Sequence, residues 1–170
     1  MMLVAQGCIV ADPPEYQAPG RTRPLLNVYG ASPTATQALV VLTNPPVAHK
    51  FSIQVRSEDA GEELRAIFWL DYQFPGEDSL VGIKIPASTY DDPGRNIRFD
   101  WYPIPGKYSA GCHFLSLVVA HRNSFYLETQ EDHLIPKEAE VDAAIVTWTV
   151  NLDPVGAENT LANCPSKAAP

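Results

Sequence analysis

Short apolar runs separated by turn residues fill the chain between residues 25 and 152. The run 49–55 alternates strictly, because Phe51, Ile53 and Val55 are separated by single polar residues. A period of two places alternate side chains on one face of an extended segment, which is typical of a half-buried β-strand. We therefore interpret this part of the chain as β-structure.

Similar runs, most of them bounded by Gly, Pro or Asn, predict the other strands. We expect strands at 25–29, 38–42, 49–55, 64–72, 80–85, 97–101, 114–121, 125–127 and 143–152. The segment 128–142 is rich in acidic residues and is predicted to be a loop. Many short strands at this spacing, with no long helical pattern, favour an all-β sandwich or barrel of antiparallel sheets.

The segment 111–119 favours the sandwich over the barrel. Its sequence, Gly-Cys-His-Phe-Leu-Ser-Leu-Val-Val, resembles the Gly-x-His-x-Leu-x-Val run found late in many bacterial immunoglobulin-like domains. The resemblance implies an immunoglobulin-like antiparallel β-sandwich, with extended N- and C-terminal tails outside it. It also implies that alternate residues of this strand share the core face: His113, Leu115, Leu117 and Val119. In the last strand, one face is expected to hold Val146, Trp148 and Val150.

The N-terminus carries a second resemblance. A short apolar run leads into Ala5-Gln6-Gly7-Cys8, which resembles the lipobox of bacterial lipoproteins. The resemblance implies that Cys8 is lipidated, and that a lipid anchor holds the protein in the cell envelope, at the outer membrane or in the periplasm. A signal normally has a basic region and an apolar stretch of roughly 7–15 residues. No Lys or Arg precedes Arg21, so we expect the natural start to lie upstream. The alternative is a short buried strand with an incidental cysteine.

Composition divides the chain into four parts. We expect a residual signal at 1–8, a Pro-rich tether at 9–24, the sandwich at 25–152 and an irregular tail at 153–170. An extended tether rises about 3.1 Å per residue, so it can hold the domain up to ~50 Å from a membrane. An ordinary flexible N-terminus is the alternative.

The charge and hydropathy of the chain limit its partners. The 170 residues carry a formal net charge of −8, which argues against nucleic acid, because phosphates require a basic surface. No stretch approaches the roughly 18–20 apolar residues of a membrane helix, so we expect membrane attachment through lipid alone.

The three cysteines are Cys8, Cys112 and Cys164. If Cys8 is lipidated, the other two form an even pair, and in an oxidising compartment a Cys112–Cys164 disulfide persists. Closing a loop of about 50 residues stabilises a fold by roughly 3–4 kcal/mol. The alternative is a pair of free buried thiols in a cytosolic protein.

Candidate chemistry is sparse. The histidines lack the spacing of a zinc site, and His113 and His121 lie too far apart on one strand to share a metal. Ser109 and Ser116 near His113, with Asp71 as a third member, suggest a hydrolytic triad. However, Ser116 points to the opposite face from His113, and no nucleophile elbow or glycine-rich phosphate loop is present. We therefore expect a protein that is not an enzyme and that has no metal or cofactor.

Two features leave a ligand-binding alternative open. Trp69, Tyr72, Trp101 and Tyr102 flank the Pro-rich corners and form a candidate binding face for sugar or protein, unless they are core residues. The loop 91–96 is a candidate source of oxygen ligands for calcium, although it lacks alternating ligand spacing.

The sequence therefore predicts a lipid-anchored envelope protein that serves as a structural or protein-interaction module, with a protein partner in an envelope assembly. A ligand-binding sandwich for carbohydrate or calcium is the alternative. The candidate edge strands, 97–101 and 25–29, are where a strand from another chain is expected to add.

Overall fold

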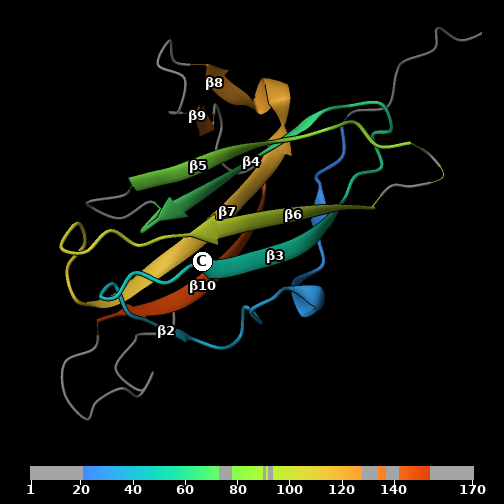
Figure 1. Ribbon diagram of the computed structural model, residues 1–170. Coiled ribbons are helices and arrows are strands. Elements are labelled where there is room, and N and C mark those ends of the chain that lie inside the picture. Colours follow the sequence, from blue (N-terminus) through green and yellow to red (C-terminus); the bar gives the residue numbers. More distant parts are fainter. Residues whose placement is uncertain are drawn as a thin grey trace, which may run out of the picture.

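The computed structural model describes residues 21–72, 78–89, 91, 94–127, 134–136 and 142–153. Within these ranges the regular structure is β-strand and two short 3-10 helices, and the strands form a β-sandwich (Figure 1). The strands are β1 Leu25–Leu26, β2 Leu39–Val41, β3 His49–Arg56, β4 Leu64–Leu70, β5 Asp78–Ile85, β6 Gly94–Trp101, β7 Gly111–His121, β8 Phe125–Leu127, β9 Leu134–Pro136 and β10 Ala144–Leu152. The all-β prediction is confirmed.

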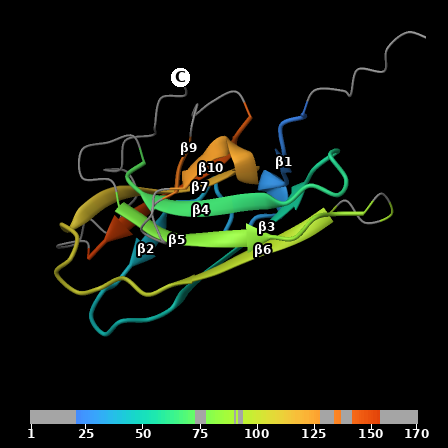
Figure 2. The ribbon, with the colours of Figure 1, turned by 90° about the horizontal axis from the view of Figure 1, so that it is seen from above.

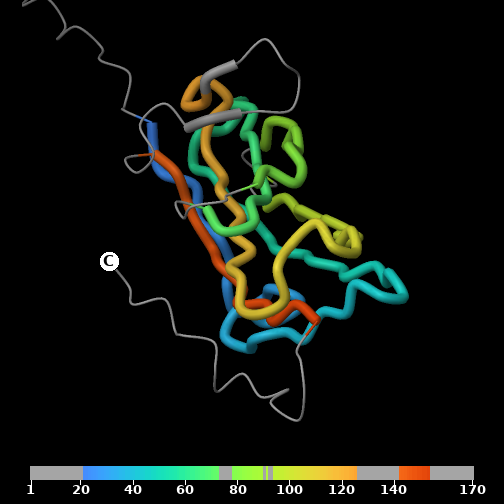
Figure 3. Tube along the Cα trace, turned by 90° about the vertical axis from the view of Figure 1, so that its left-hand side faces the viewer, coloured from blue at the N-terminus to red at the C-terminus, as the bar shows by residue number. Residues whose placement is uncertain are grey.

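Two sheets form the layers of the sandwich (Figure 2). One has three strands in the order β1-β3-β6, and the other has five in the order β2-β10-β7-β4-β5. Strands β8 and β9 make a separate two-stranded sheet. One pair departs from the expected antiparallel pattern, because β2 runs parallel to β10, with Val150 opposite Leu39. The first strand also lies beside β10, so the beginning and end of the sandwich meet (Figure 3).

Strands β7 and β10 form the centre of the larger sheet, and their core faces are those that the alternation predicts. Leu115 lies opposite Trp148 and Leu117 opposite Val146 in the antiparallel ladder. All four of these side chains are buried, and His113 is buried on the same face of β7. The alternation along both strands therefore identifies their core residues correctly.

Aromatic rings join the two sheets across the core. The ring centroid of Phe51 on β3 lies 5.3 Å from that of Trp148 on β10 in an edge-on arrangement. Phe68 on β4 stacks on Phe99 of β6 at 4.4 Å. Such pairs add about 0.5–1.5 kcal/mol beyond the burial of their area. These contacts fix the sandwich around its middle.

A second apolar cluster lies on the outer face of the five-stranded sheet. It contains Ile67, Trp69, Tyr72, Val118, Ala120, Phe125 and Ala143. Strands β4 and β7 are therefore buried on both faces, which explains why their sequences are nearly continuous in apolar residues.

Two elements differ from the prediction. Strand β1 ends at Leu26, since the Asn27 side chain accepts a hydrogen bond from the Gly30 N–H at 3.2 Å and begins a 3-10 helix, Val28–Gly30. Strand β9 lies inside the predicted acidic loop, where Tyr126 of β8 pairs with Ile135. The loop prediction was wrong at these three residues.

The chain ends lie outside the described residues. Residues 1–20 and 154–170 hold the predicted signal and lipidated Cys8, most of the tether, Cys164 and nearly all of the C-terminal tail. The described strands begin at Leu25 and end at Leu152. Within the described ranges, no helix is long and apolar enough to cross a membrane.

Candidate functional site

The four aromatic residues proposed as a binding face do not form one. Trp69 and Tyr72 are 6% exposed and contact each other in the outer cluster, with ring centroids 5.6 Å apart. Trp101 is 4% exposed in the main core, because it alternates with outward-facing Asp100 on β6. Only Tyr102, at 60%, is exposed. Three of the four residues are therefore core side chains, as the alternative reading held.

The suggested triad residues Asp71, His113 and Ser109 do come together. His113 Nδ1 lies 2.6 Å from Asp71 Oδ2, and its Nε2 lies 2.9 Å from the carbonyl oxygen of Ser109. The second carboxylate oxygen of Asp71 accepts the backbone N–H of Phe114 at 2.9 Å. Asp71 has a left-handed backbone with φ of 55°, a conformation that Asp tolerates better than most residues.

The contacts of His113 indicate a structural role, in which the side chain connects neighbouring segments of the chain. Both ring nitrogens face oxygen acceptors, so the ring donates from both when it is protonated. The hydrogen bond to Asp71 raises the pKa of His113, outweighing the opposing effect of burial. The Ser109 hydroxyl is 3.5 Å from Nε2, which already faces the Ser109 carbonyl. The closer partner of Nε2 is therefore the carbonyl oxygen and not the hydroxyl, and the ring links the residue after β4 to the loop before β7.

Ser116 occupies the opposite face of β7, as the parity argument predicts. Its hydroxyl lies 3.0 Å from that of Thr147 on β10. It therefore takes no part in the cluster around His113.

His121 fastens the start of the described chain to the far end of β7. Its Nε2 lies 3.1 Å from Asp59 Oδ2, and the same oxygen accepts the backbone N–H of Thr22 at 2.9 Å. Although partial burial raises the pKa of Asp59, hydrogen bonds from Thr22 and the nearby His121 lower it below its ordinary value. Among the described residues, no three His, Cys, Asp or Glu side chains are grouped to hold a metal ion.

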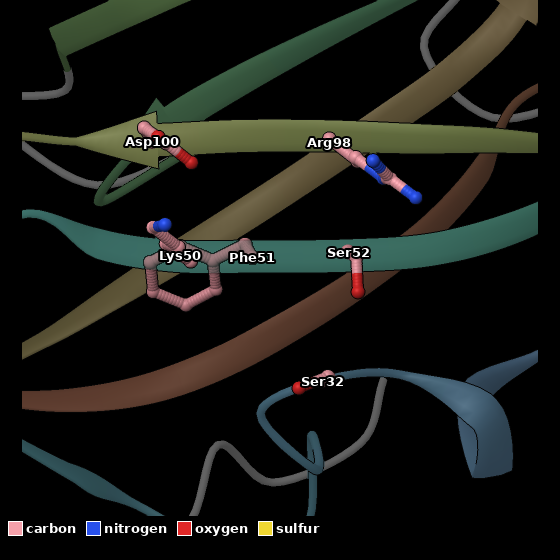
Figure 4. Close-up of a pocket in the computed structure, with 6 residues that line it drawn as sticks. All are labelled: Ser32, Lys50, Phe51, Ser52, Arg98 and Asp100. Carbon is pink, nitrogen blue, oxygen red and sulfur yellow. The ribbon is translucent and has the colours of Figure 1, made fainter.

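A polar groove of about 450 Å³ runs over the outer face of the three-stranded sheet (Figure 4). It is lined by Ser32, Lys50, Phe51, Ser52, Arg98 and Asp100. Strict alternation on β3 and β6 turns the charged residues outward, and the register sets Lys50 opposite Asp100 and Ser52 opposite Arg98. The serine hydroxyls and the cationic side chains of Lys50 and Arg98 are suited to bind a polar or anionic group of a ligand.

The groove fits the predicted small ligands poorly. Phe51 is only 1% exposed, so the lining offers no aromatic platform for a sugar ring. Asp100 is its one carboxylate, whereas calcium takes 6–8 oxygen ligands. The other calcium candidate, the loop 91–96, includes residues 92 and 93, which lie outside the described residues.

Strand β6 is an edge strand. It pairs with β3 along its whole length, from Gly94 opposite Arg56 to Trp101 opposite His49, and it is the last strand of its sheet. Strand β1 is the opposite edge, with two residues paired to β3. Both edges predicted from the sequence are confirmed, although the second is shorter than expected.

Cys112, at the start of β7, is disulfide-bonded. Cys8 and Cys164 lie outside the described residues. The pairing of Cys112 with Cys164, and the lipidation of Cys8, therefore stay predictions.

Comparison with known proteins adds little beyond the fold. No protein-family model and no curated protein sequence matches the chain. Among solved structures, the chain is similar to AggA, the major subunit of aggregative adherence fimbriae type I from Escherichia coli, with a TM-score of 0.40 and 13% sequence identity. The match covers 80% of this chain and 98% of that one. We draw no functional conclusion from a similarity at this level.

Proposed function

We propose that this protein is a non-enzymatic, lipid-anchored component of the cell envelope that binds a partner protein as a structural or interaction module. The observation that carries the interaction role is the edge of β6, eight residues long and paired on one side only among the described strands, beside the polar groove that includes Arg98 and Asp100. An edge strand presents a row of backbone hydrogen-bonding groups to another chain. The absence of an enzymatic role is supported by the placement of His113, whose ring nitrogens both face acceptor oxygens.

The position of Arg21 and Thr22, the first described residues, supports display from an N-terminal anchor. Arg21 pairs with Glu62 at 3.0 Å, and Thr22 bonds to Asp59, so the chain enters at the turn after β3. The opposite end of the sandwich, where β3 begins at His49, lies about 23 Å from Arg56 along the strand. A tether attached at residue 21 would hold the loops at that opposite end away from the membrane.

The anchor is tested with the protein expressed from its natural start. The wild-type protein should incorporate a radiolabelled fatty acid and partition into detergent, and Cys8→Ser should abolish both. Labelling that survives in the Cys8→Ser protein would contradict lipidation at this residue.

The interaction role is tested by photo-cross-linking in intact envelopes. A photoreactive amino acid at Asn96, an exposed residue of β6, should give a discrete cross-linked protein band. The same group at Thr36, exposed in the segment before β2, is the matched control and should not. Equal cross-linking from both positions, or none from Asn96, counts against a partner at the edge.

A further inference from the structure

We propose that β6 binds an extended segment of its partner in which apolar residues alternate with acidic ones. This inference rests on the proposed interaction role and specifies the chemistry of the partner. It follows from three properties of the edge: the direction of its backbone groups, the groove beside it, and the sign of the charges around that groove.

The backbone of β6 offers hydrogen bonds on its open side. Ser52 of β3 exchanges both backbone hydrogen bonds with Ser32, at 2.8 and 2.7 Å, on the side away from β6. In an antiparallel sheet alternate residues direct their backbone groups to the same side, so the odd-numbered residues of β3 bond to β6. Their partners on β6 are also odd-numbered. The N–H and C=O groups of Asn96, Arg98 and Asp100 therefore point toward the open side.

A groove follows this open side. Strand β5 is the edge of the five-stranded sheet, and it lies next to β6, the edge of the other sheet (Figure 2). Between them is a groove of about 400 Å³, with an apolar floor of Ile83, Ile85 and Ile97. A strand added to β6 directs alternate side chains into this groove and the others to solvent. The inward set must therefore be apolar.

The charges around the groove indicate which residues the partner strand should carry at the positions that point to solvent. The described lining of the groove includes Lys84, Arg95 and Arg98 and holds no carboxylate, although the whole chain has a net charge of −8. Arg98 is exposed, and Lys84 is exposed but pairs with Glu63 at 2.8 Å. The Arg95 guanidinium is held by a 2.8 Å hydrogen bond to the Pro86 carbonyl. Acidic side chains on the partner complement this local concentration of cations.

The same cations oppose the simplest rival occupant, which is a second copy of this protein. Two β6 strands paired antiparallel about Arg98 would set the two Arg98 side chains directly opposite each other, with Asn96 opposite Asp100. Like charges on neighbouring strands are destabilising, and charged edges are a known means of preventing self-association. The edge is therefore suited to an acidic partner and unsuited to its own copy.

The test uses the full chain and a synthetic peptide of about nine residues, a common strand length, in which valine and glutamate alternate. Amide hydrogen exchange is followed by NMR with and without the peptide. In the free protein, the amides of Asn96, Arg98 and Asp100 should exchange quickly, while Ile97 and Phe99 are protected by β3. The peptide should slow exchange at the first three. Peptide binding without this protection would overturn strand addition.

Two controls separate strand addition from general charge attraction. A peptide with lysine in place of glutamate should bind weakly, and so should the glutamate peptide when the N–H groups on one of its edges are methylated. Arg98→Glu should weaken binding of the glutamate peptide by at least about tenfold and improve binding of the lysine peptide. Arg56→Glu makes the same charge change at an exposed β3 residue outside the groove, and it should leave affinity within about twofold.

The outcomes also distinguish this inference from the proposed function. If Arg56→Glu weakens binding as much as Arg98→Glu, the groove does not select the peptide and the inference is wrong. If the protein dimerises through β6, shown by light scattering and protected β6 amides without peptide, a second copy is the occupant. If Asn96 cross-links to an envelope protein while no acidic peptide binds, the interaction role stands and only the chemistry proposed for the partner fails.

Discussion

His113 Nδ1 lies 2.6 Å from Asp71 Oδ2, and this contact joins the start of β7 to the residue that follows β4. The connection is reinforced by the backbone, because the Asp71 N–H donates to the Phe114 carbonyl at 2.7 Å while its side chain accepts from the Phe114 N–H. The other ring nitrogen faces the Ser109 carbonyl at 2.9 Å. One side chain therefore connects the loop before β7, the strand itself and the turn after β4.

The hydrogen bonds of His113 should make the free energy of unfolding depend on pH. The pKa of His113 is raised above its ordinary value of 6.5, chiefly by the hydrogen bond to Asp71. A raised folded-state pKa means that the extra stability is fully present below 6.5 and is lost as pH rises through the folded value. We expect His113→Gln to cost about 1–2 kcal/mol at pH 6 and clearly less at pH 9, as measured by urea unfolding.

Asp71→Asn is the matched control for the charge. Asn tolerates the left-handed backbone and keeps an acceptor for the Phe114 N–H, so the fold should be retained. An NMR titration should show a lower His113 pKa in this variant than in the wild-type protein. A pKa that does not change would mean that Asp71 is not the cause of the shift.

Two tryptophans provide a test of hydrogen bonding in the core. Trp148 is fully buried and its indole N–H donates to the Pro33 carbonyl at 2.8 Å. Trp69 is 6% exposed, and its indole nitrogen has no hydrogen-bond partner among the described residues. Trp148→Phe leaves a carbonyl without its donor and should cost about 2–3 kcal/mol.

Trp69→Phe removes the same atoms from an indole that donates to no described residue, so it should cost clearly less. Both losses can be measured by chemical denaturation with unchanged m-values. Equal losses would show that ring volume, and not the hydrogen bond, dominates at both sites.

The strands that the sequence predicts best are those whose two faces meet different surroundings. Strand β3 has the core on one side and solvent on the other, so its alternation identified Phe51, Ile53 and Val55 as buried. Strand β4 is covered on both faces, and apolar residues occupy both its odd and its even positions, so its sequence did not indicate which face lies in the main core. Parity also separated Ser116 from His113 correctly, because it depends only on the period of a strand.

Pairing between strands that are far apart in the chain could not be predicted from the sequence. The parallel contact of β2 with β10 joins residues about 110 positions apart, and the three residues of β2 carry no signal of direction. Strand β9 was missed because it is short, ends in Pro136 and lies among acidic residues. The Asp71–His113 contact could be suspected only as part of a triad, since its structural role depends on where the Ser109 carbonyl points.

Asp153 should stabilise the junction of β2 and β10 in a pH-dependent way. Its carboxylate accepts the Thr43 N–H at 2.7 Å and also the Thr43 hydroxyl, while its own N–H donates to Val41. These hydrogen bonds from Thr43 lower the pKa of Asp153 below its ordinary value of 3.8. The stabilising effect is therefore present above pH 3.8 and is lost as pH falls through the folded value.

Asp153→Asn keeps a side chain that tolerates the φ of 41° at this position, so it isolates the effect of the charge. We expect its melting temperature to lie below that of the wild-type protein at pH 6 and to approach it near pH 3. A difference that stays constant across this range would mean that the carboxylate charge is not responsible.

The last prediction concerns the partner of Cys112, which is disulfide-bonded at the start of β7. If Cys8 is lipidated, Cys164 is the one cysteine left in the sequence to pair with it. The segment from Leu152 to Cys164 can span up to about 40 Å, so its length permits the bond. Peptide mapping under non-reducing conditions should recover a Cys112–Cys164 peptide pair. Closing a loop of about 50 residues contributes roughly 3–4 kcal/mol, so reduction and Cys164→Ser should each lower the melting temperature by several degrees. Recovery of a Cys8–Cys112 pair instead would exclude this disulfide and, with it, lipidation of Cys8.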